Sequence, residues 1–241
     1  MTPQETLAWA FSEFDRVALV ASFQAESGVL IDMACRQGLK PEVLTLDTGR
    51  LPEETHAVMQ EFSARYPITL KVIQPDAAEV EAMTGAHGTN LFLKSVDLRL
   101  RCCEVRKSRP LERALRDYTA WVTGVRRQQS ATRAATPIVA TDTDHGGIAK
   151  IAPLAEWSHD QVWDYIREQD VPVHPLYALG YTSIGCAPCT RATQPGEDER
   201  AGRWWWEQDG IKECGLHFDP TKSAISREPL DPLQRSNKEM A

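Results

Sequence analysis

Long apolar runs are missing from this sequence of 241 residues. No stretch approaches the roughly 20 apolar residues that a membrane-spanning helix needs. The opening MTPQETLAWAFSEFDR also lacks the basic start and following apolar stretch of a secretory signal. We therefore expect a cytoplasmic protein that does not associate with membranes.

Internal repeats and low-complexity tracts are missing too, and charge of one sign is only mildly in excess. The formal net charge of −7 argues against non-specific binding to nucleic acid. With 42% hydrophobic and 25% charged residues, the composition is ordinary for a globular protein. A chain of this length buries most of the surface that its unfolded form exposes, so its core needs no disulfides.

Short apolar runs of β type alternate with helical patterns along most of the chain. We expect strands at 17–23, 42–47, 68–73, 120–125 and 148–154, and helices at 29–38, 52–66 and 159–170. This alternation predicts an α/β fold with a doubly wound, mostly parallel sheet, in which ligands bind at the carboxyl ends of the strands. The composition changes near Gly196, so we expect one α/β unit over residues 1–195 and a mobile C-terminal segment over 196–241.

The segment SFQAESG at residues 22–28 joins an expected strand to an expected helix. Helix N-termini attract anions, and Ser22, Ser27 and Gly28 could donate hydrogen bonds to one. It is not a Walker A loop, because no Gly-Lys-Ser/Thr follows. An ordinary turn explains the segment equally well.

Two further polar segments follow expected strands. LDTG places Thr48 and Gly49 where a base or ribose could approach the backbone, although a plain turn is the favoured interpretation there. TGVRRQQSATRA carries a stronger signal, because its guanidinium groups match the geometry of phosphate and sulfate. Its candidate residues are Gly124, Arg126, Arg127 and Arg133.

Four of the six cysteines form two pairs. Cys102 and Cys103 are adjacent, with Cα atoms about 3.8 Å apart, which is below the ~4.4 Å at which ordinary disulfides begin. Cys186 and Cys189 form a Cys-x-x-Cys. Zinc suits an adjacent pair poorly, whereas an iron–sulfur cluster offers each sulfur its own iron. A redox Cys-x-x-Cys is the competing interpretation, but it leaves the adjacent pair unexplained.

The other two cysteines stand alone. Cys35 lies in an apolar helical pattern and is interpreted as a small buried hydrophobe. Cys214 lies in KECGLHF, close to Lys212 and three residues before His217. A thiol near a cation can act as a nucleophile, although an inert exposed thiol is an equal alternative.

Together these motifs resemble the assimilatory adenylyl-sulfate reductases, thioredoxin-dependent enzymes that reduce activated sulfate to sulfite. The most specific parts are CC…CAPC and the terminal ECGLH, and the resemblance spans nearly the whole chain. It implies an adenine nucleotide alpha hydrolase-like fold. It also implies a [4Fe–4S] cluster, which separates these enzymes from cluster-free relatives that act on phosphoadenylyl sulfate. The implied cluster ligands are Cys102, Cys103, Cys186 and Cys189.

The resemblance further implies two chemical steps. Cys214 attacks the sulfur of adenylyl sulfate, AMP leaves, and thioredoxin then releases sulfite from the S-sulfocysteine. His217 is expected to orient or protonate groups near the nucleophile, and Lys107 to link cluster and sulfate. The cations expected around the anion are Lys107, Arg126, Arg127, Arg133, Arg200 and Arg203. The residues expected around the nucleotide are Ser22, Ser27, Gly28, Thr48, Gly49 and Gly124.

Three alternatives stay open at this point. A phosphoadenylyl-sulfate reductase would carry out the same chemistry without a cluster. An ATP-pyrophosphatase-type enzyme of tRNA thiolation would need a Ser-Gly-Gly-x-Asp-Ser loop, which SFQAESG does not provide. A non-catalytic metal-binding module would leave Cys214 and the arginines without a role.

Overall fold

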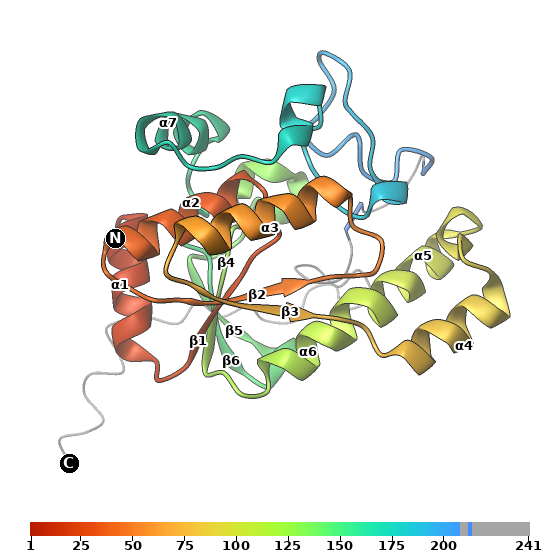
Figure 1. Cartoon of the computed structure of the whole chain (residues 1–241), viewed down its shortest axis with the longest axis horizontal. Coiled ribbons are helices and arrows are strands. Elements are labelled where there is room, and N and C mark those ends of the chain that lie inside the picture. Colours follow the sequence, from red (N-terminus) through yellow and green to blue (C-terminus); the bar gives the residue numbers. More distant parts are fainter. Residues whose placement is uncertain (208–211, 214–241) are drawn as a thin grey trace.

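A computed structural model describes residues 1–207 and 212–213, which form a six-stranded sheet with helices on both faces (Figure 1). The strands are β1 (Val17–Val20), β2 (Glu42–Leu46), β3 (Thr69–Ile73), β4 (Ala120–Thr123), β5 (Val139–Asp142) and β6 (Ile148–Ile151). The α-helices are α1 (Pro3–Glu13), α2 (Ala25–Arg36), α3 (Glu53–Arg65), α4 (Ala77–His87), α5 (Val96–Cys103), α6 (Arg109–Leu115) and α7 (His159–Gln169). Of the helices in these residues, none is long and apolar enough to cross a membrane.

Shorter helical pieces connect these elements. A π-helical stretch at Glu104–Ser108 joins α5 to α6. Single turns of 3₁₀ helix lie at Leu91–Leu93, Arg127–Gln129, Ala131–Arg133, Thr143–His145, Pro175–Leu179 and Ala187–Cys189.

The strand order is β3-β2-β1-β4-β6-β5, and neighbours are parallel except for β5 and β6. The chain runs outward from β1 to β3 and then crosses to the other side of β1 to form β4. The carboxyl ends of β1 and β4 therefore flank the point where the winding reverses, which is where doubly wound sheets bind their ligands. The predicted α/β fold with a mostly parallel sheet is confirmed.

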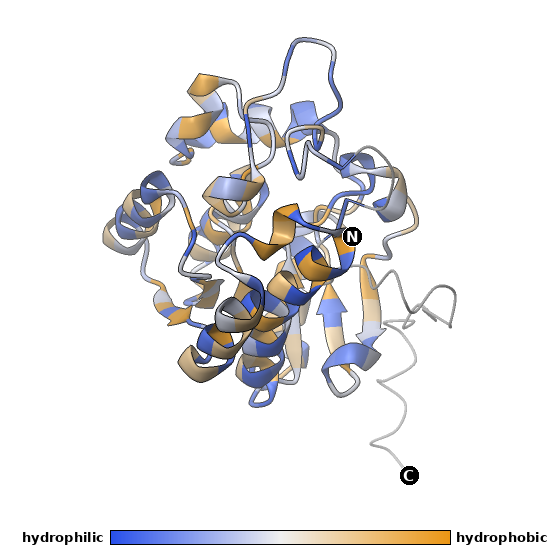
Figure 2. Cartoon of the chain, turned by 90° about the vertical axis from the view of Figure 1, so that its right-hand side faces the viewer, coloured by the Kyte–Doolittle hydropathy of each residue, from blue (hydrophilic) through white to orange (hydrophobic). Residues whose placement is uncertain are grey.

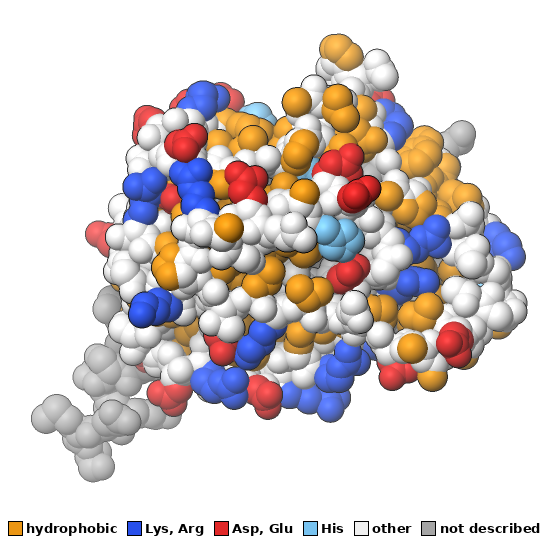
Figure 3. Space-filling model, in the orientation of Figure 1, with side chains coloured by type: hydrophobic (Ala, Val, Ile, Leu, Met, Phe, Trp, Pro, Cys, Tyr) orange, Lys and Arg blue, Asp and Glu red, His pale blue; other side chains and the backbone are white. Residues whose placement is uncertain are grey.

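Side chains that alternate along the strands divide the core into two layers. Val17 and Leu19 of β1 pack in the core cluster that includes residues of α1, α2, α3 and α7. Ala18 instead belongs to the cluster formed with Leu111 of α6 and Trp121 of β4. The helices carry hydrophobic as well as hydrophilic residues, as packing of one face requires (Figure 2). On the surface seen in Figure 3, Lys and Arg side chains lie among Asp and Glu side chains.

The strands and helices expected from the sequence are found close to their predicted positions. The sequence analysis does not anticipate β5, which is short and pairs antiparallel at the edge of the sheet. It also leaves out α1 and the helical region from α4 to α6. The expected C-terminal segment is described only in part, and there Arg203 and Trp204 are buried.

Candidate functional site

A cavity of about 170 Å³ lies at the carboxyl ends of β1, β2 and β4. Its walls come from the loops after these strands, the first turn of α2 and the segment from 183 to 203. Most of the residues expected to contact substrate line this cavity, namely Ser22, Ser27, Thr48, Lys107, Gly124, Arg133, Arg200 and Arg203. The fold therefore brings together side chains that are up to 181 positions apart in the sequence, from Ser22 to Arg203.

Hydrogen bonds fix the loop between β1 and α2. The side-chain amide of Gln24 donates to Ser22 Oγ over 3.0 Å, and its oxygen accepts from the Ile184 N–H over 2.7 Å. Ser27 Oγ donates to the carbonyl of Gln24 over 2.9 Å. The first turn of α2 is thus held at the cavity wall, where its N-terminal end favours an anion.

Two glycines allow α2 to pack closely. A Cβ on Gly124 would lie 2.8 Å from Glu26 Cβ, so only glycine lets the end of β4 approach α2 this closely. A Cβ on Gly28 would lie 3.0 Å from Phe62 Cζ in α3. Within the described chain Gly28 and Gly49 lie outside the cavity lining. Gly49 forms the turn after β2 with a φ of +70°, a conformation that glycine adopts readily.

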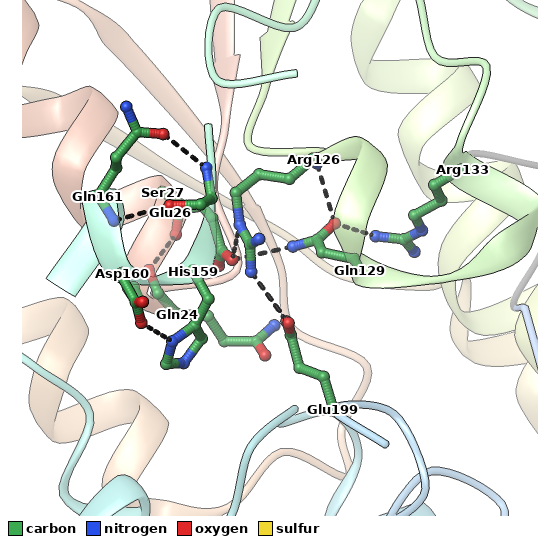
Figure 4. A network of polar contacts seen from close by, with 12 residues as sticks. Gln24, Glu26, Ser27, Arg126, Gln129, Arg133, His159, Asp160, Gln161 and Glu199 are labelled. Carbon is green, nitrogen blue, oxygen red and sulfur yellow. Dashed lines mark hydrogen bonds and ion pairs between the residues drawn. The ribbon is translucent and has the colours of Figure 1, made fainter. Parts of the chain in front are cut away.

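Arg126 is buried in an ion-pair network beside the cavity (Figure 4). Its side chain is 1% exposed, and it donates to Glu26 over 2.8 Å and to Glu199 over 3.0 Å. Burial raises the pKa of Glu199, against the lowering effect of Arg126. Both carboxylates line the cavity, whereas Arg126 lies outside the lining in the described part of the chain. Its Nε and Nη2 are therefore bound to Glu26 and Glu199, whereas Nη1 is buried without a partner among the described residues.

Gln129 extends this network to Arg133. Its amide nitrogen donates to Glu26 over 3.0 Å, and its oxygen accepts from Arg133 Nη1 over 2.7 Å (Figure 4). Arg127, in contrast, bonds to the Thr136 carbonyl and to the exposed Glu156. Neighbouring arginines in one motif thus differ in role, because successive side chains leave the backbone in different directions.

The four paired cysteines are buried around a second, smaller cavity. Cys102 and Cys103 end α5, and Cys186 and Cys189 flank the 3₁₀ turn at Ala187–Cys189. Each is 7% or 8% exposed, and all are free thiols within the described residues. Burial raises the pKa of Cys102 and raises that of Cys189 to about 11. Without a bound cationic centre, such thiols stay protonated at neutral pH.

The donor set around this cavity suits an iron–sulfur cluster. No group of three or more His, Cys, Asp or Glu side chains in residues 1–207 and 212–213 is placed to hold a metal ion as it stands. The thiols nevertheless share one cavity with Phe92 and Trp204, and four cysteines are the usual ligands of a cluster. Cations on the same walls would offset the negative charge that the four thiols carry as thiolates once a cluster is bound. These cations are Arg50, Arg99, Arg106, Lys107 and Arg203.

Lys107 and Arg203 line both cavities. Lys107 comes from the π-helical stretch directly after the adjacent cysteines, and such stretches are frequent at functional sites. Arg203 is 5% exposed, and its guanidinium lies 4.8 Å from the ring centre of Trp204. Among the described residues, Arg203 Nε is buried without a hydrogen-bond partner, which is uncommon in folded proteins.

The sequence analysis missed Glu199 and Gly185 in the cavity wall. Glu199 carries no motif of its own, and only the fold brings it to Arg126. Gly185 precedes Cys186, and a Cβ there would lie 2.3 Å from Arg203 Nη2. The glycine directly before the Cys-x-x-Cys is a sequence signal for such a close approach. The expected catalytic residues Cys214 and His217 lie outside the described residues.

Comparisons with known proteins point to one family. Residues 16–192 match the phosphoadenosine phosphosulfate reductase domain. The chain is 46% identical over 212 residues to the adenosine 5′-phosphosulfate reductase of Burkholderia cepacia, covering 88% of this chain and 84% of that protein. The phosphoadenylyl-sulfate reductase of Candida auris, solved as a phosphate complex, is similar in structure with a TM-score of 0.67. It is 30% identical, over 78% of this chain and 89% of that one. The Candida glabrata FMN adenylyltransferase with FAD and pyrophosphate shares the fold alone, with a TM-score of 0.56 and 14% identity over 95% of this chain and 75% of that one.

Proposed function

This chain belongs to the phosphoadenosine phosphosulfate reductase family, and we propose that it reduces adenylyl sulfate to sulfite and AMP. Relatives named adenosine 5′-phosphosulfate reductase match it at about 45% identity over most of both chains. The observation that carries the proposal is the cavity at the reversal of the sheet, which joins a nucleotide-binding position to a wall of cations. The protein is thus an oxidoreductase that acts on a sulfur group.

The two sides of the cavity suit the two ends of this substrate. The first turn of α2 and the backbone at Gly124 offer the close approach that a nucleotide needs. Lys107, Arg200 and Arg203 offer positive charge and hydrogen-bond donors to the sulfate. A thiolate that approaches a doubly negative substrate is repelled, and cations around the sulfate reduce this repulsion in the transition state.

Cys214 is the proposed nucleophile. Its thiolate forms a bond to the sulfur of adenylyl sulfate while the bond from that sulfur to the phosphate oxygen breaks, so AMP leaves with the electron pair. A dithiol, which we propose to be thioredoxin, then attacks the Cys214 sulfur, and sulfite leaves with the electron pair of the S–S bond. The second thiol of this partner then attacks the resulting mixed disulfide, so Cys214 leaves as a thiolate and the dithiol, now a disulfide, has supplied the two electrons. His217 is proposed to orient groups around the Cys214 thiol. We further propose that the protein acts in sulfate assimilation in the cytoplasm.

Four buried cysteines are the proposed ligands of a [4Fe–4S] cluster, namely Cys102, Cys103, Cys186 and Cys189. When bound, the cluster would supply a fixed metal centre whose charge acts on the same cations that line the substrate cavity. Lys107 and Arg203 hold the substrate anion in this arrangement. The thiols themselves only bind the metal and keep the two loops together.

Replacing Cys214 tests the proposal. In Cys214→Ser, sulfite release from adenylyl sulfate with reduced thioredoxin should fall to background, while about four irons per chain remain. Cys35→Ser is the matched control, because Cys35 lies in α2 away from both cavities, and it should retain activity and iron. Sulfite release that survives in Cys214→Ser would refute the nucleophile. Zinc in place of iron would refute the cluster.

The structurally similar Candida auris protein is a phosphoadenylyl-sulfate reductase, so phosphoadenylyl sulfate is the competing candidate substrate. Glu26 and Glu199 line the cavity, and their carboxylates oppose a ligand with an additional phosphate. We therefore expect a higher kcat/KM for adenylyl sulfate than for the phosphorylated form. A higher kcat/KM for phosphoadenylyl sulfate would instead identify the protein as a phosphoadenylyl-sulfate reductase.

A further inference from the structure

We propose that Glu213 is a positioning residue, which anchors the chain directly before Cys214 to the cationic cavity wall. The inference rests on the proposed function, because it takes Cys214 to be the nucleophile. Its basis is the set of contacts that the described pair Lys212–Glu213 makes with the rest of the protein.

The carboxylate of Glu213 is almost completely buried and is bound by several donors. It is 2% exposed, and its two oxygens accept from Arg133 Nε over 2.9 Å and from Arg133 Nη2 over 2.8 Å. Arg200 Nη2 donates to it over 3.2 Å, and Thr132 Oγ1 over 3.1 Å. A bidentate arginine pair fixes the orientation of both partners, which a single point charge does not.

The backbone of the same two residues is held as well. Arg99 Nη1 donates to the Glu213 carbonyl over 2.6 Å, and Arg200 Nη2 donates to the Lys212 carbonyl over 2.8 Å. Arg99 is itself fixed, since its Nε is paired with Glu207 over 2.7 Å and its guanidinium lies 4.5 Å from the ring centre of Trp204. Arg99 therefore holds the main chain alone, whereas Arg200 Nη2 contacts both the main chain and the Glu213 carboxylate.

The position of the carboxylate relative to the cavity decides what it does. Arg133 and Arg200 line the cavity, whereas Glu213 lies outside the lining of the described part of the chain. Glu213 thus binds these arginines without lining the cavity, which stays available to a ligand. Although burial acts to raise it, hydrogen bonding from Arg133 and the charge of Arg200 lower the pKa of Glu213, so the group is ionised at neutral pH.

Anchoring of Glu213 limits where the next residue can go. Cys214 follows through one peptide bond, so the fixed main chain of Glu213 restricts the point from which the proposed nucleophile can start. The network continues from Arg133 through Gln129 to Glu26 at the start of α2. Arg133 and Gln129 thereby link the residue before the nucleophile to the loop proposed to hold the nucleotide.

The test is Glu213→Gln, which keeps the shape and removes the charge. We expect single-turnover formation of the S-sulfocysteine, followed by mass spectrometry, to slow by about 10- to 100-fold, because misplacement of a reacting group by about 1 Å costs that much. Affinity for AMP should change less than about threefold. Glu213→Asp should give an intermediate rate, because it keeps the charge on a shorter side chain.

Glu197→Gln is the matched control. Glu197 accepts two hydrogen bonds of 2.8 Å from Arg191, the same bidentate geometry, but at the surface. Its rate of S-sulfocysteine formation should equal that of the parent protein. Should Glu213→Gln fail to fold, as judged by circular dichroism and iron content, Thr132→Val decides the question, because it removes one donor to Glu213 and should still slow the step.

The outcomes are distinguishable. A parent-like rate of S-sulfocysteine formation in a folded Glu213→Gln would overturn the inference, as would a faster rate or an effect confined to AMP affinity. A slow step with retained AMP affinity supports it. If the proposed function itself is wrong, a different experiment shows it, because the Cys214→Ser variant then still releases sulfite.

Discussion

Replacing Gly185 by alanine tests whether Arg203 holds the substrate anion. A Cβ at this position would lie 2.3 Å from Arg203 Nη2 and 2.5 Å from its Cζ, far inside contact distance. To restore an ordinary separation of about 3.5 Å, the guanidinium must move by roughly 1 Å. Its hydrogen bonds oppose this movement only weakly, because the contacts of Nη1 with Ser183 and Ile184 are long, at 3.3 and 3.4 Å.

The expected loss follows from that displacement. A hydrogen bond to a charged group contributes about 1.5–3 kcal/mol, so Gly185→Ala should weaken binding of adenylyl sulfate by about 10- to 150-fold. Overpacking should lower the free energy of unfolding by about 1–3 kcal/mol. Binding is measured by equilibrium titration in the Cys214→Ser background, where turnover is blocked, and stability by thermal melting followed with circular dichroism.

Gly85→Ala is the control, because Gly85 is exposed on α4 with open space around its Cα. It should leave binding unchanged and raise stability by about 0.5–1 kcal/mol. In an Arg203→Ala background, Gly185→Ala should cause no further loss of affinity, because the group it displaces is gone. Parent-like affinity of Gly185→Ala, or a full additional loss without Arg203, would refute this reasoning.

Three further expectations concern buried and exposed charges. Arg126→Met should lower the free energy of unfolding by about 3–5 kcal/mol in urea denaturation, because it leaves the buried Glu26 and the partly buried Glu199 without their cation. Arg127→Ala should leave kcat/KM unchanged and shift stability by less than about 0.5 kcal/mol, since its pair with Glu156 is exposed. Asp142→Asn should destabilise the protein at pH 7, where Asp142 accepts from Trp121 and pairs with His145. Burial acts to raise the pKa of Asp142, but His145 and Lys150 bring it below its usual value. The stability it contributes is therefore present above the ordinary carboxyl pKa and is lost as pH falls through the lower folded value. The urea midpoints of Asp142→Asn and the parent should thus converge in acid, and a constant difference would contradict the assignment.

Periodicity and spacing predicted the features that depend on local sequence. The buried strands β1, β2 and β4 are apolar runs that only a covered parallel sheet explains, and the four cysteines of the two pairs do line one cavity. The edge strand β5 escaped prediction because its pairing with β6, not its own pattern, makes it a strand.

Long-range partners limit what a motif can show. The run at 126–133 predicted cations near an anion, but only Arg133 lines the cavity. Arg126 is neutralised by Glu26 and Glu199, which lie 100 and 73 positions away in the sequence. No local pattern marks such a pair, because the two carboxylates meet the arginine only after the sheet has formed.

The two cavities cannot be treated as separate sites, because Lys107 and Arg203 belong to the walls of both. A cation that faces buried thiolates is less available to a substrate anion, and the reverse holds as well, since charges at this range act strongly in a buried environment. Lys107 follows the adjacent cysteines by a few residues on the π-helical stretch, and Arg203 is held against Trp204 in the wall of the cysteine cavity. Any group that binds the thiols therefore sets the charge that the substrate meets. Under the proposed function, the cluster that the cysteines hold acts on the substrate through its charge, and the cysteines themselves exchange no electrons with the substrate.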